Sequence, residues 1–126
     1  MKKNIHLLMS VLAFFVFCGV VSANEIDDLL NKAKREGKPV MLEVGSDACL
    51  PCIQMQPVMK RLEDEYKDKM FVIYADATKY RDISRKFHIL GLPTQIFLDK
   101  KGNEFHRHIG FYSYKEIKDL LKKIDL

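Results

Sequence analysis

Two cysteines separated by two residues are the strongest chemical signal in this chain. Cys49 and Cys52 enclose the dipeptide Leu50-Pro51 and follow an apolar run. The thiolate is the reactive form of cysteine, and a helix N-terminus favours that anion because its backbone N–H groups lack partners. A helix that begins at this pair makes Cys49 the exposed nucleophile and Cys52 the buried resolving thiol of a thiol–disulfide exchange.

An acidic residue lies inside the apolar run that precedes the cysteines. Glu43 is the one charge in residues 40–44. Burial of a carboxyl group raises its pKa, which brings the group closer to the range useful for proton exchange at neutral pH. We therefore expect Glu43 to serve as a general base for Cys52. The alternative is an acid at a strand end that faces water, because glutamate is usually exposed.

The remaining sulfur and imidazole side chains do not form a convincing metal site. One Cys-x-x-Cys pair cannot complete a four-cysteine zinc site or a framework of several disulfides, and Cys18 lies in the N-terminal apolar run. His106 and His108 share one face of a predicted strand, and we expect them at the surface, far from the cysteines. We expect Met55 and Met59 to fill the core, and we expect no metal ion or cofactor.

The N-terminus has the pattern of a secretory signal. Two lysines follow Met1, residues 5–21 are mostly apolar, and the small residues Ser22 and Ala23 end the run. Cleavage after Ala23 would leave residues 24–126 as the exported protein, in the periplasm or another extracytoplasmic space. The alternative is an uncleaved membrane anchor, since the run is close to the shortest membrane span.

Length and charge restrict the remaining possibilities. The chain has 126 residues, enough for one small domain. Its net charge is +4, but residues 1–23 contain two of its 21 basic residues and no acid, which leaves 19 basic residues against 17 acidic ones. This balance gives no electrostatic reason to expect a nucleic-acid partner.

The apolar pattern predicts alternating helices and strands. Helices are expected at 24–36, 49–67 and 80–87 and from Ser113, where Glu116 completes a capping box. Strands are expected at 40–44, 70–74, 95–98 and 104–109, the last two joined by a turn. This order predicts an α/β fold with a mixed sheet and helices on both faces. The inward face of the second helix is expected to consist of Ile53, Val58, Met59, Leu62 and Tyr66.

Several motifs at matching distances carry a family resemblance. The chain from about Glu25 to Ile124 resembles the thioredoxin superfamily nearly throughout, with Glu43 at the place of the family's buried acid. The motifs that carry it are Cys49-Leu50-Pro51-Cys52, Pro57, Leu92-Pro93-Thr94 and Gly110. The resemblance implies a thioredoxin fold with a central mixed four-stranded sheet that lacks the first family strand.

The resemblance also implies the roles of site residues. It implies a cis bond before Pro93, close to a redox-active disulfide between Cys49 and Cys52. It further implies that the segment Leu92, Pro93 and Thr94 binds an incoming extended chain through its backbone. Two residues depart from the family pattern. Ala48 replaces the usual tryptophan, and Tyr74 falls near the place of the basic residue that is often paired with the buried acid.

These observations predict a monomeric thiol–disulfide oxidoreductase that acts on disulfides of exported proteins. We expect a reductant, which requires a membrane thiol reductase as its electron donor. An oxidant or isomerase would use the same residues, and the reduction potential separates these possibilities. Two further alternatives are a metal-binding or metal-delivery module that uses the cysteines and a methionine, and a non-catalytic adaptor with a structural disulfide.

Overall fold

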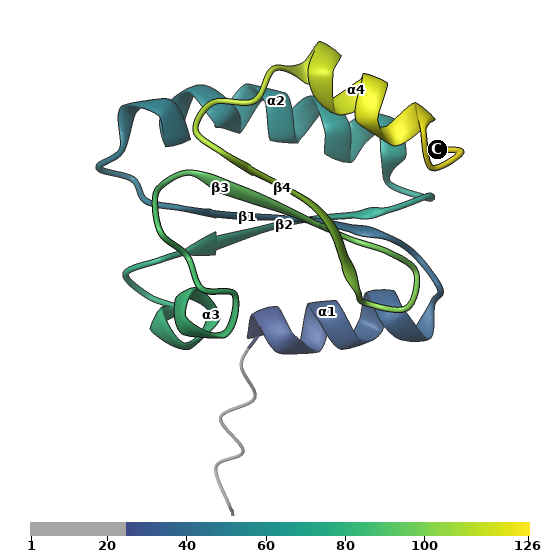
Figure 1. Cartoon of the computed structure of the whole chain (residues 1–126), viewed down its shortest axis with the longest axis horizontal. Helices are drawn as coiled ribbons and strands as arrows, with labels where there is room; N and C mark the ends of the chain where they lie inside the picture. The colour runs from purple at the N-terminus through teal and green to yellow at the C-terminus, as the bar shows by residue number, and fades with distance from the viewer. Residues whose placement is uncertain (1–24) are drawn as a thin grey trace, which may run out of the picture.

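The computed structural model describes residues 25–126, which form a sheet flanked by helices (Figure 1). The predicted secretory signal, its cleavage position after Ala23 and Cys18 lie outside the described residues. None of the helices within residues 25–126 has both the length and the apolar character needed to cross a membrane.

Helices and strands follow one another in the predicted order. The helices are α1 (Glu25–Arg35), α2 (Leu50–Tyr66), α3 (Arg81–Lys86) and α4 (Tyr114–Lys122). The strands are β1 (Val40–Gly45), β2 (Phe71–Asp76), β3 (Thr94–Leu98) and β4 (Glu104–Ile109). The predicted bounds differ from these by at most two residues, as is usual at the ends of such elements.

The sheet has the strand order β2-β1-β3-β4. β1 pairs in parallel with β2 and antiparallel with β3, and β4 is antiparallel to β3. Figure 1 shows α2 and α4 on one face of the sheet and α1 and α3 on the other. The predicted α/β fold with a mixed four-stranded sheet is thus confirmed. The lack of the first family strand concerns residues before Glu25 and stays a prediction.

Side chains of the central strand alternate between the two faces, and each face packs into its own apolar cluster. The cluster towards α1 and α3 includes Val40, Leu42, Val44, Ile73 and Ile96. The cluster towards α2 and α4 includes Met41, Met55, Leu62, Phe97 and Ile117. Because both faces of β1 are covered, its sequence is apolar on both faces, with Glu43 as the one polar exception.

The buried face of α2 differs from the prediction at two positions. Met59, Leu62 and Tyr66 are buried as expected, but Ile53 is 52% exposed and Val58 is half-buried. Their places are taken by Cys52 and Met55, which lie seven and four residues before the buried Met59 and therefore on the same side of the helix. The predicted packing of Met55 and Met59 in the core is confirmed.

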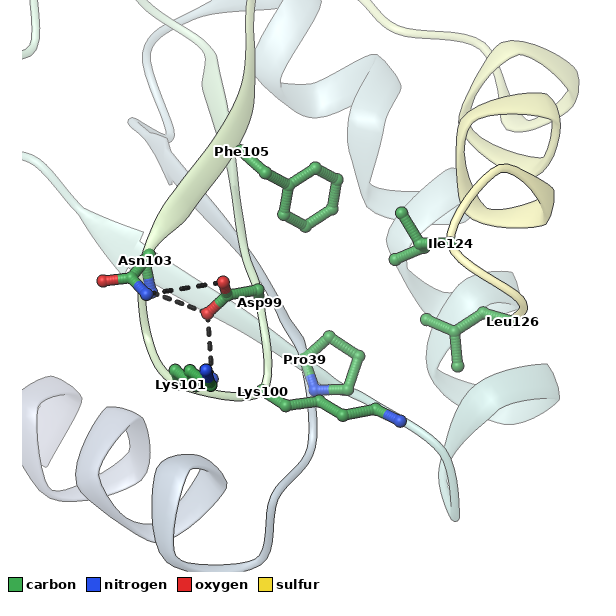
Figure 2. Close-up of a pocket in the computed structure, with 8 residues that line it drawn as sticks. All are labelled: Pro39, Asp99, Lys100, Lys101, Asn103, Phe105, Ile124 and Leu126. Carbon is green, nitrogen blue, oxygen red and sulfur yellow. Dashed lines mark hydrogen bonds between the residues drawn. The ribbon is translucent and has the colours of Figure 1, made fainter.

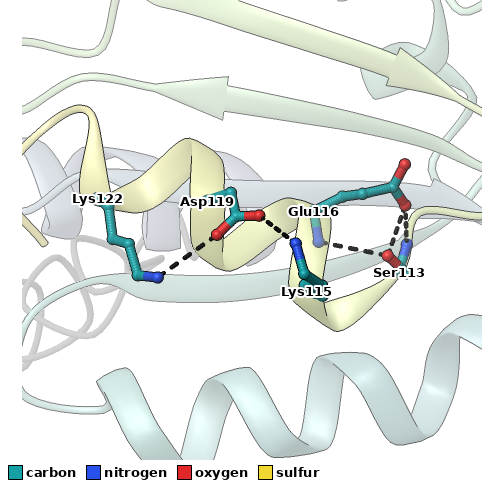
Figure 3. A network of polar contacts seen from close by, with 5 residues as sticks. All are labelled: Ser113, Lys115, Glu116, Asp119 and Lys122. Carbon is teal, nitrogen blue, oxygen red and sulfur yellow. Dashed lines mark hydrogen bonds and ion pairs between the residues drawn. The ribbon is translucent and has the colours of Figure 1, made fainter.

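The start of α4 is held by the capping box that the sequence predicts (Figure 3). The hydroxyl of Ser113 accepts a hydrogen bond from the backbone N–H of Glu116 at 3.3 Å, and the Glu116 carboxylate accepts one from the backbone N–H of Ser113 at 3.1 Å. The Glu116 carboxylate also accepts a hydrogen bond from the Ser113 hydroxyl at 2.5 Å, which makes the largest contribution to lowering the pKa of Glu116, followed by the Ser113 backbone N–H. The box ties the last helix to the chain that leaves β4.

We expect Ser113→Ala to lower the free energy of unfolding by about 1 kcal/mol, because the backbone N–H of Glu116 loses its hydrogen-bond acceptor. The measurement is urea denaturation at pH 7. Lys115→Ala serves as the control, since it removes an exposed ion pair with Asp119 on the same helix (Figure 3) and should change the free energy by less than about 0.5 kcal/mol. Equal losses in the two variants would show that the box does not stabilise the helix.

Candidate redox site at the start of helix α2

Cys49 and Cys52 form a disulfide at the N-terminus of α2. Their Cα atoms are 5.2 Å apart. Cys49 is the N-cap residue and is half-buried, whereas Cys52 lies in the first turn and is 1% exposed. The Cys49 Sγ atom accepts a hydrogen bond from the backbone N–H of Cys52 at 3.3 Å. Such a donor stabilises negative charge on Cys49 once the disulfide is reduced.

Glu43 lies on β1 and is completely buried. Its Oε2 atom accepts a hydrogen bond from Nε2 of Gln95 at 3.4 Å, whereas Oε1 has no hydrogen-bond partner. Burial raises the pKa of Glu43 to about 7, although the hydrogen bond from Gln95 acts in the opposite direction. The predicted burial of Glu43 is confirmed, and the alternative of an acid that faces water is wrong.

Gly45 connects the buried acid to the redox pair. Residues 43 and 45 of β1 point to the same face of the sheet. A Cβ atom added to Gly45 would lie 3.0 Å from Cε2 of Tyr74 and 3.4 Å from Sγ of Cys52. Tyr74 and Cys52 therefore approach the strand closely at Gly45, on the face to which Glu43 belongs. A glycine at this position leaves room for both side chains.

The segment that contains Pro93 lies beside the end of β1, because Val44 pairs with Thr94. The peptide bond between Leu92 and Pro93 is cis, the isomer that the resemblance implies. Pro93 and Thr94 are buried, and Leu92 is half-buried. The Thr94 hydroxyl donates to the Gly91 carbonyl at 2.7 Å. The structure thus brings together both segments that the sequence assigns to the site.

Two polar residues flank Glu43, of which the resemblance placed Tyr74 near the buried acid and sequence reasoning missed Gln95. The register pairs Glu43 with Tyr74 on β2 and with Gln95 on β3. Gln95 is completely buried, and the Tyr74 hydroxyl is buried without a hydrogen-bond partner. The available signal was the same as for Glu43, namely a polar residue in an otherwise apolar strand.

The two histidines lie closer to this site than expected. His108 pairs with Gln95 across β3 and β4, and its ring stacks on Tyr112 with centroids 4.1 Å apart. His106 contacts the Tyr112 hydroxyl through Nε2 at 3.3 Å, and burial lowers the pKa of His106. Both histidines are half-buried. Neither histidine is therefore a fully exposed surface residue, and β4 places His108 beside Gln95 of β3.

Exposed apolar side chains surround the cysteines and the Pro93 segment. Leu50 and Ile53 extend from the first turn of α2, with 67% and 52% of their surface exposed. Near Pro93, Leu90, Ile109 and Phe111 are also exposed. The backbone N–H of Gly110, between Ile109 and Phe111, donates to the Pro93 carbonyl at 2.8 Å. Large exposed apolar side chains thus lie in the first turn of α2 and next to the residue that bonds Pro93.

A separate pocket lies at the opposite end of the sheet (Figure 2). The turn between β3 and β4, the start of β1 and the C-terminal residues line it, with Pro39, Phe105 and Leu126 among them. It contains neither cysteine. Within residues 25–126, no group of three or more His, Cys, Asp or Glu side chains is arranged to hold a metal ion.

The sequence is similar to several known proteins. A family model described as a thioredoxin-like domain matches residues 19–125. Thioredoxin Y, chloroplastic, of Oryza sativa subsp. japonica is 33% identical over 87 residues, which cover 69% of this chain and 49% of that protein. The thiol:disulfide interchange protein DsbD of Colwellia psychrerythraea is 29% identical over 117 residues, 86% of this chain and 19% of that protein. The chain thus spans half or less of the length of these relatives.

Solved structures share the same fold. Thioredoxin h from poplar superimposes with a TM-score of 0.69 at 28% identity, covering 80% of this chain and 89% of that one. Thioredoxin NaTrxh from Nicotiana alata gives a TM-score of 0.70 at 26% identity, covering 81% and 86%. Together with the Cys-x-x-Cys disulfide at the start of α2, these similarities show that the chain belongs to the thioredoxin superfamily of thiol–disulfide oxidoreductases.

Proposed function

We propose that the protein reduces disulfides of exported proteins through the Cys49–Cys52 pair. The observation that carries the proposal is the unequal exposure of the two sulfurs at one helix N-terminus. The half-exposed N-cap cysteine can meet a large substrate, whereas the buried cysteine can react only with its neighbour. This asymmetry suits an exchange in two steps, with one attacking and one resolving thiol.

The first step begins from the reduced pair. The Cys49 thiolate attacks one sulfur of a target disulfide, which forms a mixed disulfide and releases the first target thiolate. Backbone N–H groups at the start of α2 stabilise the Cys49 thiolate before the attack. The segment from Leu92 to Thr94 holds the target in an extended conformation, and the exposed apolar side chains around it favour unfolded or flexible apolar targets.

The second step releases the product. Glu43 accepts the proton of the Cys52 thiol, and the Cys52 thiolate attacks the Cys49 sulfur of the mixed disulfide. The Cys49–Cys52 disulfide forms and the second target sulfur leaves as a thiolate, which takes the proton from Glu43, so the target gains two electrons and the pair loses two. A pKa of about 7 suits Glu43 to this role, because the group can both accept and return a proton near neutral pH.

Another turnover requires a source of two electrons outside the cytosol. We propose a membrane thiol reductase as that donor and a periplasmic or comparable extracytoplasmic location. The signal pattern of residues 1–23 supports export. Similarity to a protein named thiol:disulfide interchange protein DsbD supports a place in a chain of thiol exchanges. Pro51, directly before the second cysteine, supports the reducing direction.

The reduction potential tests the direction of electron flow. We expect a value near the thioredoxin end of the range, about −270 mV, rather than near the oxidising end at about −120 mV. The purified protein is equilibrated with mixtures of reduced and oxidised dithiothreitol or glutathione, and its free thiols are trapped and counted. A value near −120 mV would make the protein an oxidant or isomerase. Absence of a reversible two-electron couple would exclude redox function altogether.

The assignment of attacking and resolving thiols predicts opposite behaviour for two serine variants. Cys52→Ser should accumulate a mixed disulfide with a model disulfide peptide, because Cys49 attacks and nothing releases the product. Cys49→Ser should form almost none, since Cys52 is buried. Non-reducing electrophoresis and mass spectrometry measure the adduct. Equal trapping by both variants would contradict the assignment.

Burial of Glu43 predicts a pH-dependent gain in stability for Glu43→Gln. The pKa of Glu43 rises from 4.5 to about 7 on folding, so the carboxyl favours the native state below pH 4.5 and loses that advantage as the pH rises through 7. At pH 8 we expect the free energy of unfolding of Glu43→Gln to be about 3 kcal/mol higher than that of the wild type. Below pH 4.5 this difference should disappear. Urea denaturation of both proteins from pH 4 to 9 measures this difference. A difference that does not change with pH would contradict the raised pKa of Glu43.

A further inference from the structure

A row of three polar side chains crosses the sheet beneath α2. Tyr74, Glu43 and Gln95 are directly paired on β2, β1 and β3. Four buried side-chain oxygens in the described part of the chain lack hydrogen-bond partners, and three of them belong to this row. Buried polar atoms are normally paired. Their concentration beside the redox pair therefore points to proton chemistry rather than to packing.

The orientation of the Gln95 amide is determined by a backbone carbonyl. Its Nε2 atom donates to the Gly110 carbonyl at 3.1 Å, so the nitrogen and not the oxygen must face that group. The same nitrogen carries a second hydrogen, which it donates to Oε2 of Glu43 at 3.4 Å. Gln95 is thus a dedicated donor to the buried carboxyl group.

This donor determines which oxygen of Glu43 carries the proton. A proton on Oε2 would face the N–H group of Gln95, whereas Oε1 has no partner. The neutral carboxyl therefore holds its proton on Oε1, and the charged carboxylate retains a hydrogen bond at Oε2. Without Gln95, the ionised form would lose its one side-chain donor, and either oxygen could be protonated.

Other groups around Glu43 do not duplicate this role. α2 contributes the redox pair, with Cys52 next to Gly45, and α4 contributes apolar Ile117 and Leu121 to this face. The titratable groups that face Glu43 from the neighbouring elements are Tyr74 on β2, Cys49 and Cys52 on α2 and, one strand beyond Gln95, His108 on β4. Asp47 and Asp76 act on Tyr74, whose pKa is raised chiefly by burial.

We infer that Gln95 is a positioning residue for the exchange reaction, which holds Glu43 so that Oε1 takes the proton of Cys52 and then gives it to the departing target thiolate. This inference rests on the proposed function. The step is a proton transfer from the Cys52 thiol to the Glu43 carboxylate, after which the Cys52 thiolate attacks Cys49. The carbonyl of Gly110, next to the Pro93 segment, orients the amide and so links the substrate side of the site to the proton acceptor.

The test combines Gln95→Leu with Glu43→Gln in a double-mutant cycle. A hydrogen bond to a buried carboxylate changes its ionisation equilibrium by about tenfold. In the wild type, about half of the Glu43 carboxyl groups are ionised at pH 7. In Gln95→Leu that fraction falls to about a tenth, so we expect the exchange to be about fivefold slower. Above pH 9 the two rates should converge. The measurement is the single-turnover rate of the reduced protein with a model disulfide peptide from pH 5 to 10.

Two controls distinguish a positioning role of Gln95 from a general loss of structure. In Glu43→Gln, the added Gln95→Leu substitution should leave the pH profile unchanged, because Gln95 acts through Glu43. Phe97→Leu, on the same strand and face, should weaken the fold without moving the profile, since Phe97 pairs with Met41 and has no group that donates a hydrogen bond to Glu43. If Gln95→Leu does not fold, Gln95→Met, which keeps the length of the side chain, replaces it.

An infrared titration of the Glu43 carboxyl band provides a readout that does not depend on activity. Its midpoint should be higher in Gln95→Leu than in the wild type and unchanged in Phe97→Leu. The inference would be overturned if the midpoint in Gln95→Leu were the same as in the wild type. It would also be overturned if Gln95→Leu changed the rate profile as much in the Glu43→Gln background as in the wild-type background. A wild type that exchanges no disulfides would instead refute the proposed function, and the infrared midpoint would still decide the role of Gln95.

Discussion

The pairing of β1 on both of its edges is the constraint on which the site depends. β1 runs parallel to β2 and antiparallel to β3, so the C-terminal end of β1 meets the N-terminal end of β3. The C-terminal end of β1 leads into the Cys49–Cys52 disulfide. The N-terminal end of β3 comes directly after the cis peptide bond between Leu92 and Pro93. Two segments more than forty residues apart in the sequence are thereby placed side by side. Neither segment could form the site alone.

The same pairing places a carboxyl group where it destabilises the fold once it ionises. Glu43 has neighbours on both strands and is covered by α2, so burial raises its pKa. Apolar residues with the same volume would make a more stable sheet at neutral pH. A carboxyl that retains its proton near pH 7 is useful to a buried thiol that must lose one. Stability and function therefore oppose each other at this position.

Much of the fold and part of the site could be predicted from local patterns. The order of helices and strands, the capping box of Ser113 and the unequal exposure of Cys49 and Cys52 follow from periodicity, cap residues and spacing, which neighbours in the sequence determine. The burial of Glu43 followed from its place in an apolar run. The family resemblance pointed to Tyr74 as its neighbour, but Gln95 could not be predicted, because strand register is a property of the assembled sheet.

The remaining differences have the same origin. Ile53 is apolar but points to solvent, since α2 presents Cys52 and Met55 to the sheet instead. His108 lies beside Gln95, because β4 returns along β3 in a register that the turn alone does not reveal. By itself, the sequence determined the reactive pair, the helix that begins there and the family to which they belong. Only the tertiary structure decided which side chains surround the buried acid, because contacts across strands depend on register and not on distance along the chain.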